Sequence, residues 1–369
     1  MAPHSSSSAS YSQHARTFFP RQHIAALARL QDDVPPLVPE QVRTIIEQEF
    51  GGFPDVAFAT FMDAPLASAS IGQAHAATLD DGTSVVVKVR SPGVVAPVQE
   101  DLEILQNLAH QASRNWAAQA DYNVEAIVST FAATLRAERD YLVEGRNAKR
   151  FAQNFAHDTG VHIPKIYWST TTSRALTMES IYGQRIDDAQ VTGLPVVDRD
   201  RLTTTAAKAA AQKIFEDGFF HADPHPGNLF VEATGRIGLI DFGMVGELDE
   251  QLQKRLGKLL LAFSRNNPER ISHALLGLSV NWCASDCGGL RQDMADFMQQ
   301  YRGRRLGEIR LAPLIVEMVT ILRTHHIQLL SGIALLTKMV TMTEGNGVGL
   351  HPGFNLGEVL KPYARPAGS

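Results

Sequence analysis

The segment HADPHPGNLF, residues 221–230, carries the residue types with the clearest chemical meaning. Asp223 and Asn228 have the spacing of the kinase catalytic-loop pattern H-R-D-x-x-x-x-N, with Ala222 in place of the arginine. In such loops the aspartate orients the phosphoryl acceptor or accepts its proton, and the asparagine binds a metal ion. Further along, Asp241 in LIDFG stands where a carboxylate at the end of a strand could chelate a Mg²⁺ that bridges the phosphates.

The same segment allows a second interpretation, a metal site built on His221 and His225. Zinc sites with histidines at this spacing need a continuous helix, and Pro224, Pro226 and Gly227 prevent one here. The sequence therefore favours the kinase interpretation. His221 is then a packed loop histidine, and His225 faces the acceptor or supports the residues that do.

A lysine upstream supplies the third part of a phosphoryl-transfer site. Lys88 in VVVKV matches the strand lysine of V-A-I-K, which neutralises the α- and β-phosphates. Taken alone, it could be an exposed lysine on a strand. Together, the lysine, the HxDxxxxN loop and DFG occur in the order of a kinase, and they predict binding of ATP or ADP with Mg²⁺.

Hydrophobic periodicity and turn residues predict the elements that position these side chains. The N-terminal residues 1–16 are predicted to be a disordered tail, and the chain beyond Arg199 to be mostly helical. Further predictions are two helices around the Pro35-Pro36 break, three antiparallel strands within 56–89, helices over 97–113 and 124–155, and buried strands at VHIPKIYW (161–168) and RALTMES (174–180) that close the small sheet.

A small β-rich lobe followed by a helical lobe is the outline of a kinase. We therefore expect an α+β, bilobal protein-kinase-like fold. Its N-lobe spans residues 17–180 and includes a helical N-terminal extension. Its C-lobe spans residues 181–369 and carries the catalytic loop and DFG.

Composition excludes several classes of protein. The formal net charge of -5 argues against a broad nucleic-acid-binding surface, which would need clustered Lys and Arg. Two cysteines, Cys283 and Cys287, are too few for a disulfide framework and fit a reducing cytosol. No apolar run reaches the roughly 20 residues of a membrane span. We expect a cytoplasmic protein, with peripheral membrane contact only, through RQHIAALARL (21–30). The Ser-rich start leaves organelle targeting open.

Six motifs resemble those of the UbiB/AarF family of atypical protein-kinase-like proteins: LQDDVPP, PLASASIGQAH, VVVKV, AERDYLVEGRNAKRF, HADPHPGNLF and LIDFG. The resemblance runs from about Phe18 to the C-terminus. Members of this family support ubiquinone or other isoprenoid-lipid metabolism in bacteria, mitochondria and plastids. The resemblance therefore implies an isoprenoid lipid or quinone precursor as a partner.

The resemblance also implies roles for further residues. An Ala-rich loop replaces the Gly-rich loop over the phosphates, and its side chains limit how closely the backbone can approach them. Glu144 would pair with Lys88 as the helix glutamate, and Leu229 would lie beneath the adenine. The remaining implied sites are the loop Ala67, Ser68, Ala69 and Ser70, the adenine-binding linker Met178, Glu179 and Ser180, and the regulatory E-x-D acids Glu138 and Asp140.

Three departures from related kinases are visible. No A-P-E follows DFG, and the chain passes almost directly into the predicted helix ELDEQLQKRL, so the usual platform for a peptide substrate is missing. The sequence SSAS stands at 7–10, where the family carries K-x-G-Q, the motif of an inhibitory lysine that pairs with the E-x-D acids. The hydrophobic C-terminal hairpin of some bacterial members is also absent. We therefore expect a more open acceptor pocket.

The sequence predicts an atypical kinase or ATPase that binds Mg²⁺·ATP and hydrolyses it or phosphorylates a small molecule or lipid. The alternative is a non-catalytic ATP-binding scaffold that organises enzymes of lipid biosynthesis. A conventional protein kinase is less favoured because A-P-E is missing.

Overall fold

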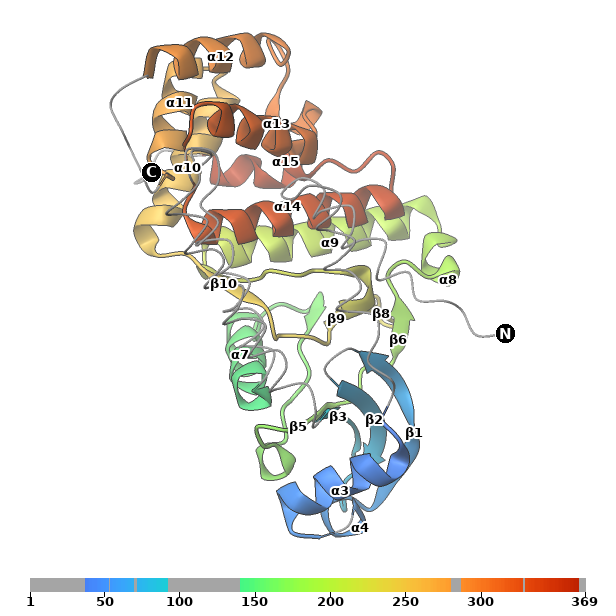
Figure 1. Ribbon diagram of the computed structural model, residues 1–369. Helices are drawn as coiled ribbons and strands as arrows, with labels where there is room; N and C mark the ends of the chain where they lie inside the picture. The colour runs from blue at the N-terminus through green and yellow to red at the C-terminus, as the bar shows by residue number, and fades with distance from the viewer. Residues whose placement is uncertain are drawn as a thin grey trace, which may run out of the picture. The chain divides into compact units, whose positions relative to one another are not determined.

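The computed structural model describes residues 37–52, 54–69, 72–91, 140–279, 287–327 and 329–364. The described chain divides into two compact units (Figure 1). The sheet unit comprises residues 37–91, 140–153 and 163–181, and the helical unit comprises residues 154–162 and 182–364. This organisation confirms the predicted α+β class, with a β-rich region followed by a largely helical one. The predicted tail, the helix at 21–30 and Glu138 lie outside the described residues.

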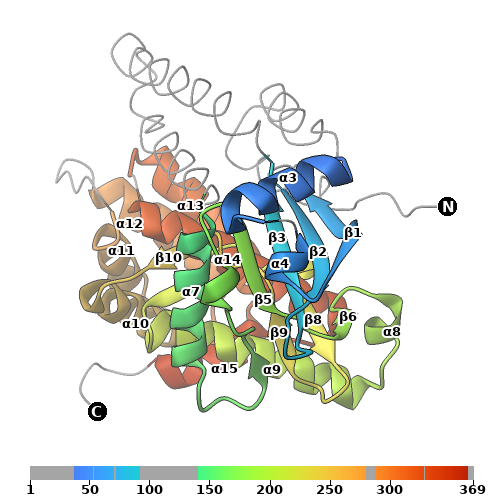
Figure 2. The same ribbon diagram turned by 90° about the horizontal axis from the view of Figure 1, so that it is seen from below.

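A four-stranded antiparallel sheet forms the centre of the sheet unit, in the order β1-β2-β3-β5. Three antiparallel strands within 56–89 are confirmed, and RALTMES supplies the fourth, but the break expected at the DAP sequence (63–65) is wrong because these residues lie inside β1. The strands are β1 (Thr60–Ala69), β2 (Gly72–Thr78), β3 (Ser84–Arg90) and β5 (Ala175–Glu179), and Figure 2 shows them side by side next to helix α3 (Pro39–Phe50).

Strand alternation decides which side of this sheet carries the candidate lysine. Val85, Val87 and Val89 of β3 are fully buried and share a core with Val42 and Ile46 of α3. Because successive side chains of a strand point to opposite faces, Lys88 lies on the other face. Helix α7 (Tyr141–Asn154) packs on that face: Gly145 approaches Leu176 of β5 so closely that a Cβ there would lie 3.4 Å from it.

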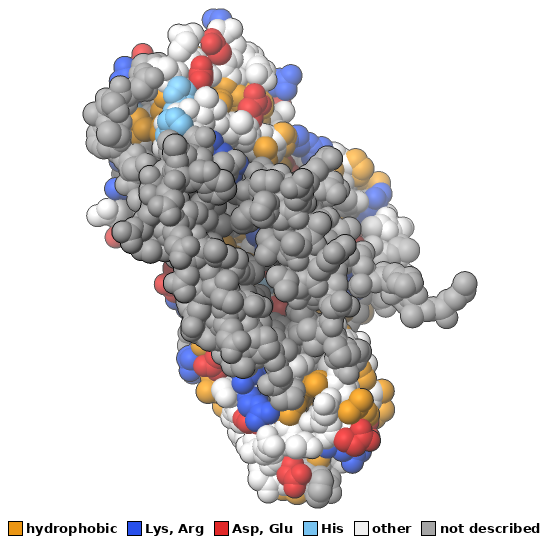
Figure 3. Space-filling view, viewed as in Figure 1, with side chains coloured by type: hydrophobic (Ala, Val, Ile, Leu, Met, Phe, Trp, Pro, Cys, Tyr) orange, Lys and Arg blue, Asp and Glu red, His pale blue; other side chains and the backbone are white. Residues whose placement is uncertain are grey.

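The surface of the sheet unit is mixed. Figure 3 shows small groups of hydrophobic side chains among acidic and basic ones over the described part of its visible face. On the edge strand β1, Met62 and Leu66 are exposed, while Asp63 forms an ion pair with Arg43 of α3 at 2.6 Å. Charged edge residues of this kind discourage pairing with a further strand.

The predicted strand VHIPKIYW is largely wrong. Only Val161–His162 forms a strand, β4, and it pairs in parallel with β9 (Ile237–Leu239) of the helical unit rather than with the small sheet. Pro164 has no backbone N–H to continue a ladder, which explains why the strand stops. Beyond it, Ile166 makes an isolated bridge to Met178 of β5.

The helical unit combines a helical core with two small sheets. One sheet has the order β4-β9-β8-β6, and the other pairs β7 with β10. Its longer helices are α9 (Val196–Phe215), α10 (Glu250–Ser264), α11 (Pro268–Leu276), α12 (Cys287–Gln299), α13 (Leu311–Thr324) and α14 (Ser331–Leu350), and its remaining strands are β6 (Gly183–Arg185), β7 (Phe219–His221), β8 (Leu229–Glu232) and β10 (Val245–Glu247).

Helix α14 is the central helix of this unit. It packs along α9, with Met339 and Val340 in one core cluster with Ala211 and Ile214 (Figure 1). Its Glu344 is 2% exposed and accepts hydrogen bonds from the first two N–H groups of α13, Leu311 N at 2.9 Å and Ala312 N at 2.7 Å. A carboxylate at this position satisfies donors that have no partner within α13.

Among the residues that the structure describes, no helix has both the length and the apolarity to span a membrane.

Candidate functional site

Lys88 and Glu144 form an ion pair within the sheet unit. Lys88 Nζ lies 2.6 Å from Glu144 Oε1, and the side chains are only 17% and 7% exposed. The contact between these two residues is therefore confirmed. Their role in binding phosphates stays a prediction.

Breaking this pair is expected to destabilise the protein. Glu144→Ala leaves the Lys88 ammonium largely buried without this partner, and the free energy of unfolding should fall by about 3 kcal/mol. The exposed pair Lys254–Glu250 is the control, because Glu250→Ala should cost less than about 1 kcal/mol. Chemical denaturation of both variants measures the difference. Equal losses at the two sites would show that the Lys88–Glu144 pair contributes no more to the free energy of unfolding than an exposed ion pair.

Asp140 makes a structural contact at the start of α7. Its Oδ1 accepts a hydrogen bond from Leu142 N at 2.9 Å, and its backbone carbonyl accepts from Val143 N and Glu144 N. This is the position of a helix N-cap, so the side chain supports the first turn of α7, the turn that carries Glu144. Its regulatory role stays a prediction.

The Ala-rich loop lies at the end of the β1–β2 hairpin. The register pairs Ala67 with Ala74, Ser68 with Gln73 and Ala69 with Gly72, and Ser70 lies outside the described residues. Gly72 is needed because a Cβ there would lie 2.4 Å from Val89 O. Ala67 and Ser68 are exposed, so their side chains do occupy the space that glycines would leave open.

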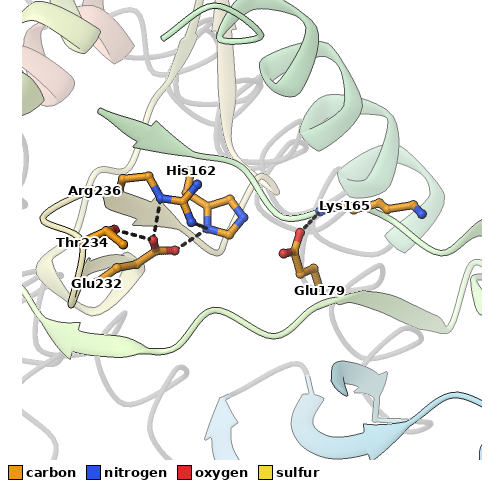
Figure 4. A network of polar contacts seen from close by, with 6 residues as sticks. All are labelled: His162, Lys165, Glu179, Glu232, Thr234 and Arg236. Carbon is orange, nitrogen blue, oxygen red and sulfur yellow. Dashed lines mark hydrogen bonds and ion pairs between the residues drawn. The ribbon is translucent and has the colours of Figure 1, made fainter. Parts of the chain in front are cut away.

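The predicted adenine-binding linker is the end of β5. Met178 is buried, pairs with Val86 and bridges to Ile166. Glu179 N donates to Lys165 O at 2.8 Å, and Lys165 N donates to the Glu179 carboxylate at 3.1 Å (Figure 4). Ser180 N donates to Ser84 O at 3.3 Å. An adenine would have to use the other backbone groups of this segment.

The catalytic-loop candidate follows β7 directly. Strand β7 pairs with β10, so that His221 stands opposite Val245, and Ala222 N donates to Met244 O at 3.0 Å. Asp223 N donates to His221 Nδ1 at 3.0 Å. These contacts bring the segment after DFG to the start of the HxD loop, within the helical unit.

Asn228 and Asp241 stand at the open end of a second hairpin. Leu229 of β8 pairs with Leu239 of β9, and Ile240 N donates to Asn228 O at 3.3 Å. Asp241 Oδ1 accepts from Gly243 N at 2.9 Å. One amide just before β8 and one carboxylate just after β9 suit Mg²⁺, which takes hard oxygen ligands and completes its shell with phosphate oxygens and water. Leu229 is buried at the base of this hairpin.

A polar network fixes the other end of that hairpin. Glu232 accepts hydrogen bonds from His162, from Thr234 Oγ1 at 3.2 Å and from Arg236 Nε at 2.7 Å (Figure 4). Burial alone would raise the pKa of Glu232, but the bonds from His162 and Arg236 lower it, so the carboxylate is charged. The network ties β4, β8 and β9 together.

The two histidines are not arranged as a metal site. His221 Nδ1 and His225 Nδ1 each accept a backbone N–H, from Asp223 and Gly227 respectively. Among the described residues, no group of three or more His, Cys, Asp or Glu side chains is placed to hold a metal. His221 is 2% exposed and lies beside Phe242, with ring centroids 6.3 Å apart. It is packed, as predicted.

The buried histidine should make stability depend on pH. Burial, with the charge of Lys213 nearby, lowers the pKa of His221 from 6.5 to about 4, so the folded protein keeps it neutral. Between these values the unfolded chain binds more protons, so the free energy of unfolding falls as pH drops, by at most about 3 kcal/mol. His221→Asn keeps an acceptor for Asp223 N and should flatten this slope in denaturation series from pH 7 to pH 4, with the exposed His157→Asn as control. A slope unchanged in His221→Asn would contradict the assignment.

Two residues of α14 that sequence reasoning missed contact the catalytic-loop candidate. Lys338 Nζ lies 3.2 Å from Asp223 Oδ1, and Asn346 Nδ2 donates to Pro224 O at 2.8 Å. A lysine within the apolar run LLTKMV was the one available signal, because a charged residue there needs a partner. That partner, Asp223, lies far upstream in the chain.

Comparison with protein families accounts for most of the chain. The family model described as ABC1 atypical kinase-like domain matches residues 29–275, and the one described as UbiB helical domain matches residues 294–355.

Curated relatives support the same assignment. A probable protein kinase UbiB of Azotobacter vinelandii is 32% identical over 94% of this chain and 66% of its own length. An uncharacterized Synechocystis protein is 33% identical over 94% of this chain and 59% of its own length. The Arabidopsis thaliana protein ACTIVITY OF BC1 COMPLEX KINASE 7, chloroplastic, is 31% identical over 94% of this chain and 50% of its own. The chain thus spans half to two thirds of these relatives.

A solved structure shares the fold. Rv3197 of Mycobacterium tuberculosis, determined in complex with erythromycin, matches with a TM-score of 0.65 at 20% identity over 98% of this chain and 92% of that chain. The predicted kinase-like fold is confirmed.

Proposed function

Because this chain belongs to the ABC1 atypical kinase-like family, we propose that it binds Mg²⁺·ATP and transfers the terminal phosphoryl group to water, a small molecule or a lipid. The observation that carries the proposal is the grouping of three residues in the helical unit. The β7–β10 pair brings the loop of Asp223 to the segment after DFG, and the β8–β9 hairpin holds Asn228 next to the segment of Asp241.

Each residue has a defined task in this reaction. Lys88, held by Glu144, neutralises the α- and β-phosphates. Asn228 and Asp241 would hold Mg²⁺, which would supply positive charge to the phosphates. Asp223 orients the acceptor hydroxyl and receives its proton. A bond forms between the acceptor oxygen and the γ-phosphorus, the bond to the β–γ bridging oxygen breaks, and its electron pair leaves with ADP.

The acceptor is proposed to be small. After Gly243 the chain forms only β10 before α10 begins at Glu250, capped by Asp249, whose side chain accepts from Leu252 N. This confirms the direct passage into the predicted helix and leaves little chain for a peptide-binding platform. Water, an isoprenoid lipid or a quinone precursor fits this architecture better than a protein substrate.

One experiment separates the enzyme from a nucleotide-binding scaffold. ATP hydrolysis and ATP-induced thermal shift are measured with Mg²⁺ and with EDTA, each with and without isoprenoid lipids in detergent. Mg²⁺-dependent turnover, increased by the lipids, is the expected result. Binding without turnover under all conditions would assign the scaffold role. A protein that neither binds nor hydrolyses ATP would overturn the proposal.

A further inference from the structure

Helix α14 contacts the catalytic-loop candidate at two points. Lys338 and Asn346 are eight positions apart, a spacing that places them on one stripe of a helix. Asn346 binds the backbone at Pro224, with 2.8 Å from Nδ2 to the carbonyl oxygen, while Lys338 binds the side chain of Asp223. The two contacts therefore act on different parts of the loop.

The Lys338 ammonium contacts both candidate segments of the helical unit, the one that carries Asp223 and the one that follows Asp241. Its Nζ lies 3.2 Å from Asp223 Oδ1 and 3.9 Å from the sulfur of Met244, three positions after Asp241. The side chains of Lys338 and Asp223 are 23% and 26% exposed. They are thus partly removed from water but still open to a ligand.

This contact is not needed to hold the backbone of the loop. Ala222 N bonds to Met244 O, Asp223 N to His221 Nδ1 and Asn346 to Pro224 O, so three hydrogen bonds already fix the chain on both sides of the aspartate. A partly exposed ion pair adds little stability. The effect of Lys338 therefore falls on the carboxylate of Asp223.

We propose that Lys338 orients the Asp223 carboxylate before phosphoryl transfer and then binds the transferred phosphoryl group. This inference rests on the proposed function. Mg²⁺ aside, a γ-phosphate approaching Asp223 and Asp241 would meet two carboxylates, and the ammonium offsets this repulsion. A lysine suits both tasks because its compact charge sits on a flexible stem that reaches two partners.

Proton transfer to Asp223 would favour a move of the Lys338 ammonium from the carboxylate to the phosphoryl oxygens. As the acceptor oxygen bonds to phosphorus, its proton moves to Asp223, and the carboxylate loses the negative charge that held Lys338. The ammonium then faces the phosphoryl oxygens, where negative charge remains. No further reactant is needed, because the proton, the phosphoryl group and the ADP account for all bonds made and broken.

The test replaces the charge and preserves the stem. Lys338→Met should lower kcat for ATP turnover by about a hundredfold, as the loss of one charge-stabilising donor does in other enzymes, with a change of less than about threefold in KM. Lys338→Arg should recover at least about tenfold of this loss, since it restores the charge at a similar distance. Lys254→Met, which removes the lysine of an exposed pair on α10, is the matched control and should leave kcat unchanged.

Binding measurements test the role of Lys338 without relying on turnover. Lys338→Met should weaken the affinity for a Mg²⁺-bound non-hydrolysable ATP analogue by about tenfold relative to that for Mg²⁺·ADP, because only the former has a γ-phosphate. Unchanged melting temperatures exclude a folding defect. If wild type binds and hydrolyses ATP while Lys338→Met matches it in both assays, the inference is wrong and the proposed function stands. If wild type binds no nucleotide, the proposed function fails, and the inference fails with it.

Discussion

Asp223→Asn is expected to lower kcat for ATP turnover by about a thousandfold while Mg²⁺·ATP still binds. Asparagine has nearly the same shape as aspartate and leaves the backbone bond from Asp223 N to His221 intact. It cannot accept the acceptor's proton, and it removes the charge that Lys338 contacts at 3.2 Å. The loss of activity should therefore appear in kcat and not in nucleotide affinity. Steady-state kinetics measure the first, and a separate nucleotide-binding titration measures the second.

A carboxylate on the surface of the same unit provides the control. Asp293 of α12 pairs with His325 at 2.8 Å and is 48% exposed, so Asp293→Asn should leave kcat within about twofold of wild type. An Asp223→Asn protein that retains more than about a tenth of wild-type turnover would show that another group accepts the proton, or that water is attacked without a base from this loop.

Asp241→Asn is expected to weaken Mg²⁺·ATP binding by about a hundredfold or more. Mg²⁺ is held in nucleotide sites by one or two carboxylates, so removing one charge takes away much of the protein's share of the coordination. Asparagine can still accept the bond that Gly243 N donates to Asp241 Oδ1, so the local turn should persist. Calorimetric titration with ATP and Mg²⁺ measures the loss.

The metal dependence of this effect is its internal control. In EDTA both proteins should bind ATP weakly, and Asp241→Asn should bind it at least as well as wild type, because without the metal the Asp241 carboxylate only repels the phosphates. A hundredfold difference that persists without Mg²⁺ would mean that the substitution disturbs the fold. Equal affinities with Mg²⁺ present would mean that Asp241 is not a metal ligand.

Local patterns predicted the sheet unit well. The alternation in SVVVKVR separates Val85, Val87 and Val89 from Lys88, and the structure keeps this separation. The strand period is recoverable because neighbouring residues record it. The pairing of Lys88 with Glu144, far apart in sequence, was instead implied by the family resemblance.

Other features depend on tertiary contacts and could not be predicted in the same way. The hydrophobic run in VHIPKIYW suggested a strand of the small sheet, but Pro164 limits the ladder and the strand joins β9 instead. Lys338 meets Asp223 only because α14 packs along α9 beside the loop. No periodicity in either segment records that packing, so the contact becomes visible only in three dimensions.

Glu344 gives helix α14 a mechanical role. Its carboxylate holds the first turn of α13, while Lys338 and Asn346 of the same helix hold the catalytic-loop segment. The first turn of α13 and the catalytic-loop candidate are therefore both bound to the same stretch of α14, so a shift of α14 would disturb both sets of contacts. Thermodynamic linkage makes this coupling reciprocal. If the protein binds nucleotide as proposed, a molecule that binds more tightly when α13 is displaced would alter nucleotide affinity by some factor, and nucleotide would alter the affinity for that molecule by the same factor.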